Sequence, residues 1–279
     1  MNIARTHTIL HPVALLLTMR NQETTKIDYG HALLVAGAYG RMGCAILAAE
    51  AALRSGCGLL TVHLPDRCVD PMQVAVPEAM VSIDASNDLF TIPPQNLERY
   101  RAIAAGPGLG TASQTREALL GLIAGCPTNT PLVLDADALN MLAPWCLPRR
   151  ERPIVVTPHD REYQRLFGDG DPAEMASKHN LIIVKKAHRT HVYSPDGQVF
   201  ENHTGNAGMA TAGCGDVLTG ILLGMLSSNI LHVDLFDIVC RAVEIHGKIG
   251  DLLLRNQSES SLIASDIVKK LCCISTDIQ

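Results

Sequence analysis

The stretch TGNAGMATAGCGDVLTGILLG, residues 204–224, joins a glycine-rich turn to the immediate start of an apolar helix. Gly213 and Gly215 can adopt backbone angles that other residues avoid. The N–H groups of residues 213–216 can therefore converge on one point at the N-terminus of that helix, where phosphate binds readily. The stretch predicts an anion-binding loop in front of a buried helix.

Asp216 follows the last glycine of this turn and would lie beside the bound phosphate. A carboxylate there can take a proton from a hydroxyl that attacks or carries a phosphoryl group. The alternative is a glycine-rich loop in which Asp216 is an ordinary N-cap residue. Four glycines, Asn206 and Asp216 in one run favour the anion site.

Composition extends this prediction to the whole fold. The chain has 279 residues, of which 47% are hydrophobic and only 4% aromatic, and it contains 22 glycines. This composition is typical of a parallel sheet packed between helices rather than of a β-sandwich. We expect a single domain over residues 1–279, with residues 1–25 as a leader segment packed on it.

The net charge and the cysteine content limit the classes of binding partner and the cellular compartment that we expect. The formal net charge of −5 and the pI near 6.1 argue against a nucleic-acid backbone as partner. Nine cysteines without a CxxC pair indicate reduced thiols. The apolar run at 9–19 is interrupted by Pro12 and is too short to span a bilayer. We therefore expect a cytoplasmic protein without a membrane anchor.

Apolar runs alternate with helical patterns along the chain, which predicts βαβ units with right-handed crossovers. The expected strands are 31–38, 59–64, 101–105, 132–135, 154–156 and 181–185, with a hairpin at 191–194 and 199–201. The expected helices are 43–55, 113–124, 216–227 and 234–254. The prediction is an α/β protein with a central, mostly parallel sheet and helices on both faces.

Each expected parallel strand ends in a loop that carries glycine, aspartate, threonine or histidine. In open α/β sheets, ligands bind outside the carboxyl ends of the strands. One cleft should therefore be shared by the loops after residues 36, 105, 135, 156 and 185 and by the 205–216 loop.

Two of these loops carry candidate binding groups. GPGLG at 106–110 lets the backbone approach a ligand closely, or is a plain strand-to-helix turn. In DADALN, Asp135 and Asp137 can orient a ligand amide or hydroxyl, or hold Mg²⁺ through water. Capping of a helix by Asp137 is the alternative. Asn140, in the same motif, and Asn206 are candidate supporting residues.

His159 stands directly after a predicted strand, in TPH at 157–159. Its ring can donate a hydrogen bond to a ligand phosphate or carbonyl if the strand ends share one cleft. Thr157 and Glu162 can instead form a capping box at the start of the following helix. Both interpretations stay open from the sequence.

Lys185 and Lys186 follow another strand and lie near His188 and Arg189. A cation there can meet a nucleotide phosphate, or the segment is simply an exposed basic strand end. No Walker A sequence, GxGxxG after the first strand, HExxH or spaced Cys/His quartet occurs. These absences argue against a P-loop enzyme, a standard dinucleotide dehydrogenase and a zinc enzyme.

The chain resembles the ADP/ATP-dependent (S)-NAD(P)H-hydrate dehydratases of the ribokinase-like superfamily. The segments that carry the resemblance are, in order, KIDYGHALLVAG, GCAILAAEAALRSGCGLLTVHLP, AAGPGLG, PLVLDADALN, VVTPHDREYQRLFG, KKAH and GNAGMATAGCGDVLTGIL. The likeness extends from about residue 16 to about residue 271.

The resemblance implies a ribokinase-like fold and a hydro-lyase that repairs the damaged cofactors NADHX and NADPHX. A nucleotide phosphorylates the C6 hydroxyl of the hydrate, and loss of phosphate then regenerates the dihydronicotinamide. The resemblance also implies Mg²⁺, ADP rather than ATP as co-substrate, a separate NAD(P)HX epimerase as functional partner, and a homo-oligomer, most simply a tetramer.

The same resemblance assigns site residues. Asp216 matches the catalytic and substrate-contacting aspartate, and Gly215, beside Gly213 of the anion site, matches a nucleotide-contacting glycine. Cys44, Gly108 and His159 match substrate-contacting positions. The segment that meets AMP is matched by Lys185, Lys186, Ala187, His188 and Arg189.

The chain departs from the family pattern in several places. The departures are Cys44 for alanine, Asp160 and Arg161 for Pro-Gly, KKAHR for KGAHT, Ala207 for proline, and Cys214 for threonine or serine. Two other functions therefore remain open. One is a small-molecule hydroxyl kinase of the same superfamily, and the other is a non-catalytic adenine-nucleotide sensor.

Overall fold

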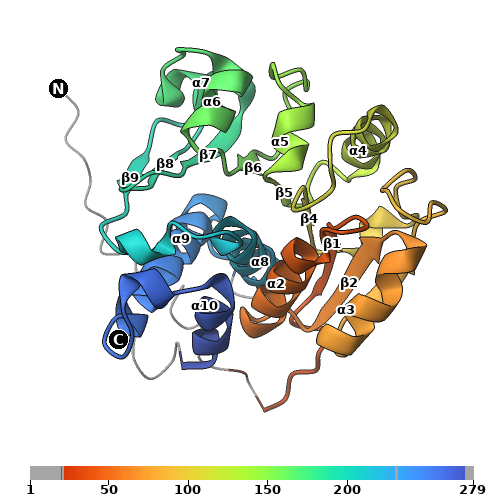
Figure 1. The fold of residues 1–279 in the computed structure, drawn as a ribbon. Helices are drawn as coiled ribbons and strands as arrows, with labels where there is room; N and C mark the ends of the chain where they lie inside the picture. The colour runs from red at the N-terminus through yellow and green to blue at the C-terminus, as the bar shows by residue number, and fades with distance from the viewer. Residues whose placement is uncertain (1–19, 21, 230–231, 274–279) are drawn as a thin grey trace.

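The computed structural model describes residue 20 and residues 22–229 and 232–273. Within these residues, a nine-stranded sheet has the order β3-β2-β1-β4-β5-β6-β7-β8-β9. Neighbouring strands from β3 to β7 are parallel, whereas β8 and β9 pair antiparallel. Helices cover both faces of the sheet (Figure 1). The predicted α/β class with a mostly parallel sheet is confirmed.

The strands are short, and each is followed by a helix or a tight loop. They are β1 (His31–Val35), β2 (Leu59–Leu64), β3 (Met80–Ile83), β4 (Ala102–Ala105), β5 (Leu132–Leu134), β6 (Ile154–Val156), β7 (Leu181–Lys185), β8 (His191–Tyr193) and β9 (Val199–Glu201). The α-helices are α2 (Met42–Arg54), α3 (Val69–Ala75), α4 (Ser113–Gly125), α5 (Asp137–Met141), α6 (Asp160–Phe167), α7 (Pro172–His179), α8 (Cys214–Ser227), α9 (Leu235–Leu253) and α10 (Ala264–Lys270).

The sheet separates two hydrophobic cores, because successive side chains of a strand point to opposite faces. Ala32 and Leu34 of β1 pack in the core that contains α2, α8 and α9. Leu33 and Val35 pack in the other core, with residues of α4, α5, α6 and α7. Burial on both faces explains why β1 is a continuous apolar run in the sequence.

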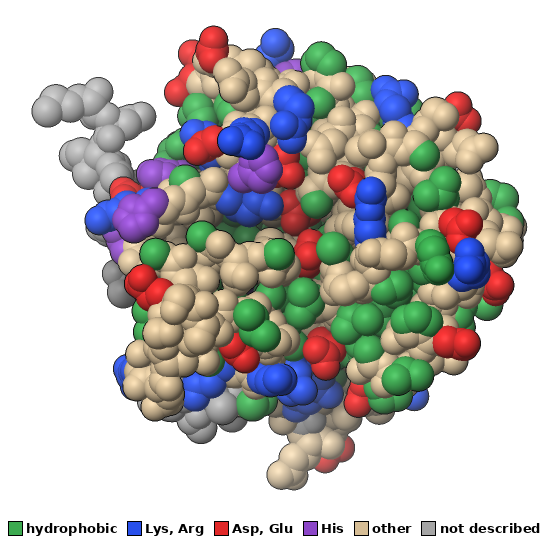
Figure 2. Space-filling view, viewed as in Figure 1, with side chains coloured by type: hydrophobic (Ala, Val, Ile, Leu, Met, Phe, Trp, Pro, Cys, Tyr) green, Lys and Arg blue, Asp and Glu red, His purple; other side chains and the backbone are tan. Residues whose placement is uncertain are grey.

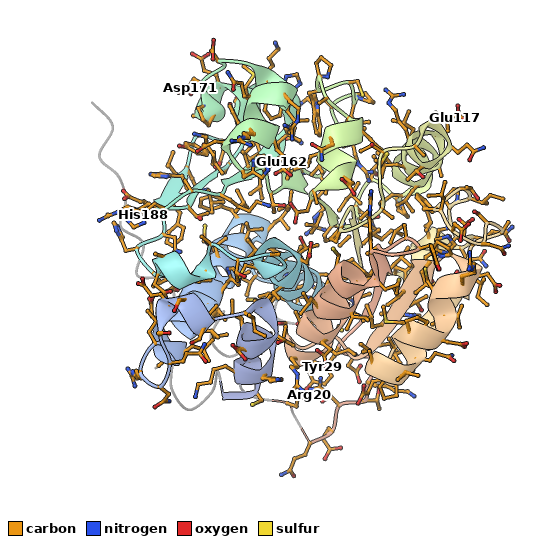
Figure 3. The ribbon with its side chains drawn as sticks, in the orientation of Figure 1. Arg20, Tyr29, Glu117, Glu162, Asp171 and His188 are labelled. Atoms are coloured by element: carbon orange, nitrogen blue, oxygen red, sulfur yellow. The ribbon has the colours of Figure 1, made fainter. Side chains whose placement is uncertain are left out.

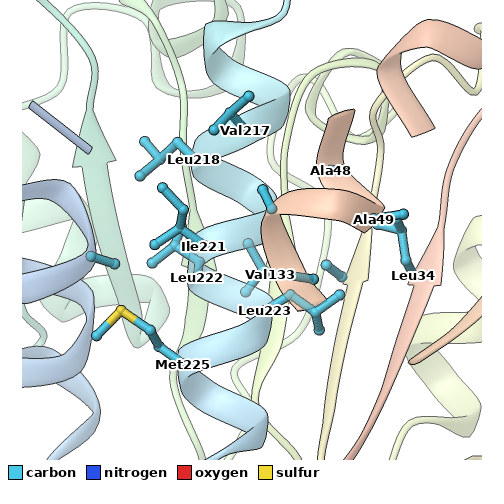
Figure 4. Packing of buried hydrophobic residues seen from close by; sticks show 14 of the residues in the cluster. Leu34, Ala48, Ala49, Val133, Val217, Leu218, Ile221, Leu222, Leu223 and Met225 are labelled. Atoms are coloured by element: carbon cyan, nitrogen blue, oxygen red, sulfur yellow. The ribbon is translucent and has the colours of Figure 1, made fainter. Parts of the chain in front are cut away.

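Helices α2 and α8 lie against each other through small residues (Figure 4). A Cβ atom added to Gly220 would lie 2.2 Å from the carbonyl oxygen of Ala48, and one added to Gly224 would lie 2.4 Å from that of Ala52. Neither position has room for a side chain, since the interior is close-packed. The contact therefore fixes the two helices relative to each other along their middle and last turns.

The long predicted helices are found within two residues of their expected ends. The expected strands and helices did not include β3, α3, α5, α6, α7 and α10. Met80 and Ile83 of the edge strand β3 are exposed, so this strand lacks the apolar run of a central strand. Helix α6 is strongly polar, and the sequence indicated it only through the alternative of a capping box with Glu162.

Most of the predicted leader segment, residues 1–25, lies outside the described residues. Arg20 is described, and it packs on the rest of the chain: its Nη2 donates to the carbonyl oxygen of Gly56, and its guanidinium lies over the Tyr29 ring (Figure 3). None of the described helices is both long and apolar enough to cross a membrane. The cysteines whose side chains are described are free thiols.

Candidate active site

The loops at the carboxyl ends of the parallel strands meet, as the sequence predicts. The backbone N–H of Gly37 donates to the carbonyl oxygen of Pro107 at 2.8 Å, and that of Lys186 donates to Pro158 at 2.8 Å. Gly106 lies directly against the backbone of Asp135. Figure 2 shows acidic, basic and histidine side chains grouped across the middle of this face of the molecule.

Asp135 follows β5 and is only 1% exposed. Lys186 Nζ donates to its Oδ1 at 2.8 Å, and Thr219 Oγ1 donates to its Oδ2 at 2.7 Å. Burial by itself raises the pKa of Asp135, but the Lys186 charge and the hydrogen bonds outweigh burial and hold the pKa below its ordinary value. We call Asp135, Lys186 and Thr219 the strand-end cluster; its carboxylate is ionised and fully partnered.

Lys186 follows β7, and its side chain is 22% exposed. Burial opposes its charge, but Asp135, Glu162 and Asp216 more than offset burial and raise the pKa of the ammonium. A Cβ atom added to Gly215 would lie 3.4 Å from Lys186 Nζ, so the cation faces the start of α8. Glu162, labelled in the upper middle of Figure 3, has its Oε2 atom 4.0 Å from the same ammonium.

Asp216 lies in the first turn of α8 and is partly buried. Burial raises its pKa to about 6, and the charges of Asp135 and Asp137 act in the same direction. The nearby Cys44 thiol and the charge of Lys186 lower the pKa but do not reverse the effect of burial. A carboxylate with a raised pKa at a partly exposed helix start suits general-base work near neutral pH.

The two glycines at the start of α8 serve different purposes. Gly213 is the N-cap residue and has a φ of 90°, a left-handed value that favours glycine, as predicted. Gly215 is helical, so the prediction of a special backbone angle there is wrong; what it supplies is space beside Lys186. The alternative in which Asp216 is the N-cap residue is also wrong, and no side chain caps this helix.

Asp137, in the DADALN motif, forms a hydrogen bond with the GPGLG loop. Its Oδ2 accepts a hydrogen bond from the Gly110 N–H at 2.8 Å, and Arg41 Nη1 lies 3.7 Å from the same oxygen. Asn140 Nδ2 donates to the other oxygen at 3.4 Å. Asp137 does not cap α5, whose N-cap residue is Ala136 at φ 48°, a value uncommon for a residue with a Cβ. Because of this turn, the side chains of Asp135 and Asp137 point in different directions and contact different partners.

Gly108, Cys44 and Asp216, three predicted substrate-contacting residues, are neighbours. A Cβ atom added to Gly108 would lie 3.1 Å from Cys44 Cβ, and Gly108 itself has a φ of 66°. The Cys44 thiol and the Asp216 carboxylate lie near enough to affect each other's pKa. Burial and the Asp216 charge raise the pKa of the Cys44 thiol to about 12, so this thiol stays protonated.

His159 is the N-cap residue of α6. Its Nδ1 accepts hydrogen bonds from the N–H groups of Arg161 and Glu162, and Glu162 Oε2 accepts from the His159 N–H at 2.8 Å. The predicted capping box therefore exists, but its first member is His159 and not Thr157. The other ring nitrogen lies 3.4 Å from Glu162 Oε1, and the side chain is 48% exposed. The predicted contact of His159 with substrate stays a prediction.

In the segment 185–189, only the side chain of Lys186 points into the strand-end cluster. The other side chains lie toward solvent. Lys185 Nζ lies 3.1 Å from Asp160 Oδ1, whereas Lys186 joins the strand-end cluster. Ala187 and His188 are exposed, and His188 lies far from Glu162 in Figure 3. Arg189 Nη1 donates to Glu201 Oε1 at 3.0 Å.

Asn206 and two residues that the sequence analysis missed complete the surroundings. Asn206 is the N-cap residue of the short helix at 207–209, and its amide donates to Asp251. Thr219 reaches Asp135 from 84 positions away in the chain. Burial and the charge of Lys186 lower the pKa of His246 on α9 to about 4, and within the described residues its buried Nε2 has no hydrogen-bond partner. No local sequence signal indicated either residue.

The described residues contain no group of three or more His, Cys, Asp or Glu side chains placed to hold a metal ion. Both oxygens of Asp135 already accept hydrogen bonds from protein groups. The arrangement therefore fits a Mg²⁺ ion that arrives with nucleotide phosphates and keeps water ligands, rather than an ion held by a protein cage.

Comparison with known proteins agrees with this arrangement. A family model described as NAD(P)H-hydrate dehydratase matches residues 32–272. The ADP-dependent (S)-NAD(P)H-hydrate dehydratase of Bacillus subtilis is 34% identical over 261 residues, which are 90% of this chain and 91% of that protein. The chain spans about half the length of relatives named as bifunctional NAD(P)H-hydrate repair enzymes, 48% for the one from Moorella thermoacetica.

Solved structures give the same result. A crystal structure of the ADP/ATP-dependent NAD(P)H-hydrate dehydratase from Bacillus subtilis, co-crystallized with ATP/Mg²⁺, superimposes with a TM-score of 0.83 at 32% identity and covers 96% of each chain. A ribokinase-like superfamily protein from Enterococcus faecalis superimposes with a TM-score of 0.82 at 29% identity, covering 94% of this chain and 92% of that one. The fold is ribokinase-like.

Proposed function

This chain belongs to the NAD(P)H-hydrate dehydratase family, and on that premise we propose that it dehydrates (S)-NAD(P)HX back to NAD(P)H with ADP as co-substrate. The chain is a hydro-lyase of nicotinamide-nucleotide repair. The observation that carries the proposal is Asp216, a carboxylate with a pKa of about 6 at the start of α8, next to the Lys186 ammonium.

The first step is phosphoryl transfer. Asp216 accepts the proton of the C6 hydroxyl while that oxygen attacks the terminal phosphorus of ADP, and the bond to the AMP oxygen breaks. At pH 7 most Asp216 side chains are ionised, since the pKa lies near 6, and they are more basic than an ordinary carboxylate. Lys186 and the first-turn N–H groups of α8 stabilise the charge on the transferred group.

The second step is elimination. Hydroxide is a poor leaving group, whereas phosphate leaves readily, so the C6–O bond breaks with its electron pair on phosphate. The proton of the adjacent ring carbon passes to the departing phosphate, and its C–H electron pair forms the ring double bond of the dihydronicotinamide. The products are AMP, phosphate and NAD(P)H.

The residues that surround Asp216 are placed for two different binding roles. Gly108 and Cys44 lie beside it and would contact the hydrate, while Gly213, Gly215 and Lys186 would contact the nucleotide. Mg²⁺, bound mainly by the nucleotide phosphates, supplies Lewis-acid neutralisation of the phosphoryl oxygens when it is present. Relatives named as bifunctional NAD(P)H-hydrate repair enzymes support an NAD(P)HX epimerase as a functional partner.

The test is recovery of dihydronicotinamide absorbance when NADHX and Mg²⁺ are mixed with the protein and either ADP or ATP. We expect recovery with ADP, release of one phosphate per NADH, and loss of both signals in Asp216→Ala. The matched control is Asp70→Asn, an exposed acid of α3, which should behave as the native protein. A phosphorylated product without free phosphate would indicate a kinase, and nucleotide binding without any turnover would indicate a sensor.

A further inference from the structure

Arg41, the residue before α2, lies against the GPGLG loop at two points. A Cβ atom added to Gly108 would lie 2.9 Å from the Arg41 carbonyl oxygen and 3.4 Å from the Arg41 Cβ. A Cβ atom added to Gly110 would lie 3.0 Å from Arg41 Nη1 and 3.9 Å from Cζ. The backbone of Arg41 therefore borders the glycine that would contact the hydrate, and its guanidinium lies over the end of the same loop.

The backbone fixes the base of this side chain. The N–H of Arg41 donates to the carbonyl oxygen of Ala38 at 2.8 Å, which closes a turn over residues 38–41. Directly before this turn, the N–H of Gly37 donates to Pro107 of the GPGLG loop at 2.8 Å. The two loops are thus bonded to each other, and the guanidinium can move by rotation of the side chain alone.

The Arg41 guanidinium has unused hydrogen-bonding capacity. Its side chain is 56% exposed, and Nη1 lies 3.7 Å from Asp137 Oδ2, which is too far for a hydrogen bond. Among the described residues, no group accepts a hydrogen bond from this guanidinium, although arginine has five N–H donors. Asp137 already accepts from the Gly110 N–H at 2.8 Å and from the Asn140 amide at 3.4 Å. Exposed ion pairs contribute little to stability, so Arg41 can exchange Asp137 for a ligand at low cost.

Arg41 and Lys186 border the proposed reaction site from different loops. Lys186 Nζ lies 3.4 Å from the place that a Cβ of Gly215 would occupy, at the start of α8, whereas Arg41 lies on the GPGLG loop. The surroundings are acidic, with carboxylates at Asp135, Asp137 and Asp216. Both substrates of the proposed reaction carry phosphates, so each needs a cation that offsets repulsion by these carboxylates. Lys186 is placed to meet the nucleotide, and Arg41 is placed to meet the dinucleotide.

We propose that Arg41 binds a phosphate group of the dinucleotide substrate and leaves Asp137 to do so. This role rests on the proposed function, which supplies the dinucleotide. A guanidinium presents its N–H groups in a planar fork that matches two phosphate oxygens. The diphosphate that NADHX and NADPHX share is one ribose away from the nicotinamide ring, whereas the 2′-phosphate of NADPHX is on the second ribose. We therefore expect the contact to be with the diphosphate.

The experiment measures steady-state kinetics of the native protein, Arg41→Ala and Arg41→Lys with NADHX and with NADPHX, at saturating ADP and Mg²⁺. In Arg41→Ala the KM should rise about ten-fold or more for both dinucleotides, as expected when a hydrogen bond to a charged group is lost. The kcat and the KM for ADP should stay within a few-fold of native, because the contact is equally strong in the ground state and the transition state. Arg41→Lys keeps the charge without the fork and should recover part of the affinity. A rise for NADPHX alone would support a phosphate contact at the 2′-phosphate instead of the diphosphate.

Arg54→Ala is the matched control, because it removes an exposed arginine from the last turn of the same helix. It should leave every KM at the native value. Native KM values in Arg41→Ala would overturn the proposal, and so would equal increases in Arg41→Ala and Arg54→Ala, which would report only the change in net charge. If Arg41→Ala does not fold, Arg41→Gln replaces it, since glutamine keeps much of the stem without the charge and should show the same increase.

A binding measurement separates this proposal from the proposed function. NADH and NADPH are titrated into protein saturated with AMP, and the fluorescence of the dihydronicotinamide gives Kd without turnover. Arg41→Ala should weaken both about ten-fold and make Kd less sensitive to NaCl, since an exposed charge contact is lost. That result supports the role of Arg41 even if the native protein fails to dehydrate NADHX. Native turnover with unchanged Kd values rejects the role and leaves the dehydratase intact, whereas a native protein that binds neither dinucleotide overturns both.

Discussion

Two carboxylates that face the same ammonium differ in almost every physical respect. Asp135, in the strand-end cluster, is fully buried and accepts hydrogen bonds from Lys186 and Thr219, and its pKa is lowered. Asp216, at the start of α8, is partly buried beside the charges of Asp135 and Asp137, and its pKa is raised to about 6. The difference shows that the interaction partners of a carboxylate, and not residue type or burial alone, set its pKa. These partners decide which carboxylate has a structural role and which is available for proton transfer.

Asp216→Asn should have the largest effect, because it removes the base and leaves the surrounding packing unchanged. Turnover should fall by about a hundred- to ten-thousand-fold, the usual contribution of general acid–base catalysis. Nucleotide affinity, measured by calorimetry, should change little, since Lys186 and the backbone of α8 remain. Turnover within a few-fold of native would show that the raised pKa of Asp216 has no catalytic meaning.

Asp135→Asn should instead act on the fold. It leaves the Lys186 ammonium largely buried without its main partner, and breaking such a pair destabilises proteins by about 3 kcal/mol or more. Urea unfolding followed by circular dichroism measures the change. The double variant Asp135→Asn with Lys186→Met should recover part of the loss because no charge is then stranded. A double variant no more stable than Asp135→Asn would mean that the ion pair is not the source of the effect.

Gly220→Ala tests whether the frame around Asp216 is as rigid as the packing indicates. The new Cβ would lie 2.2 Å from the Ala48 carbonyl oxygen, and such overpacking costs about 1–3 kcal/mol. The displaced helix would also move Asp216, which lies in its first turn, and lower kcat. Gly121→Ala on α4 is the control, because its Cβ would meet Pro93 at an ordinary 3.5 Å. It should be neutral or stabilising, through better helix propensity. Equal melting curves for the two variants would contradict this account.

The smallest expected effect concerns stability against pH. The folded-state pKa of Asp216 is raised, so the native protein binds more protons than the unfolded chain between about pH 4 and about pH 6. The favourable contribution of Asp216 is present below this window and is lost as the pH rises through it. Asp135, with a lowered pKa, contributes stability above the ordinary carboxyl pKa and loses it in stronger acid.

Asp216→Asn should therefore gain about 1–2 kcal/mol over the native protein at pH 7 and converge with it near pH 4. The measurement is the free energy of unfolding in urea at several pH values, with Asp70→Asn beside it. A gain that persists unchanged at pH 4 would mean that the asparagine stabilises through packing and not through the removed charge.

Local sequence patterns predicted much of the fold and the chemical groups of the candidate site. Apolar runs bounded by glycine marked the central strands, because a strand buried on both faces needs a continuous apolar sequence. They did not mark β3, whose exposed edge removes that signal. At the site, Asp216, Lys186 and Gly108 were all identified, but Gly215 was assigned a turn geometry and Thr157 a capping role that the structure gives to Gly213 and His159.

The sequence by itself determined the class of fold, the glycine-rich start of α8 and the presence of a carboxylate there, since each depends on residues adjacent in the chain. Only the tertiary structure decided what each group touches. Lys186 and Asp135 are 51 positions apart, and Thr219 and Asp135 are 84 apart. The pKa of each carboxylate follows from such long-range neighbours and from burial, which arise only when the sheet and its helices assemble. The fold therefore decides that Asp135 has a structural role and that Asp216 is available for proton transfer.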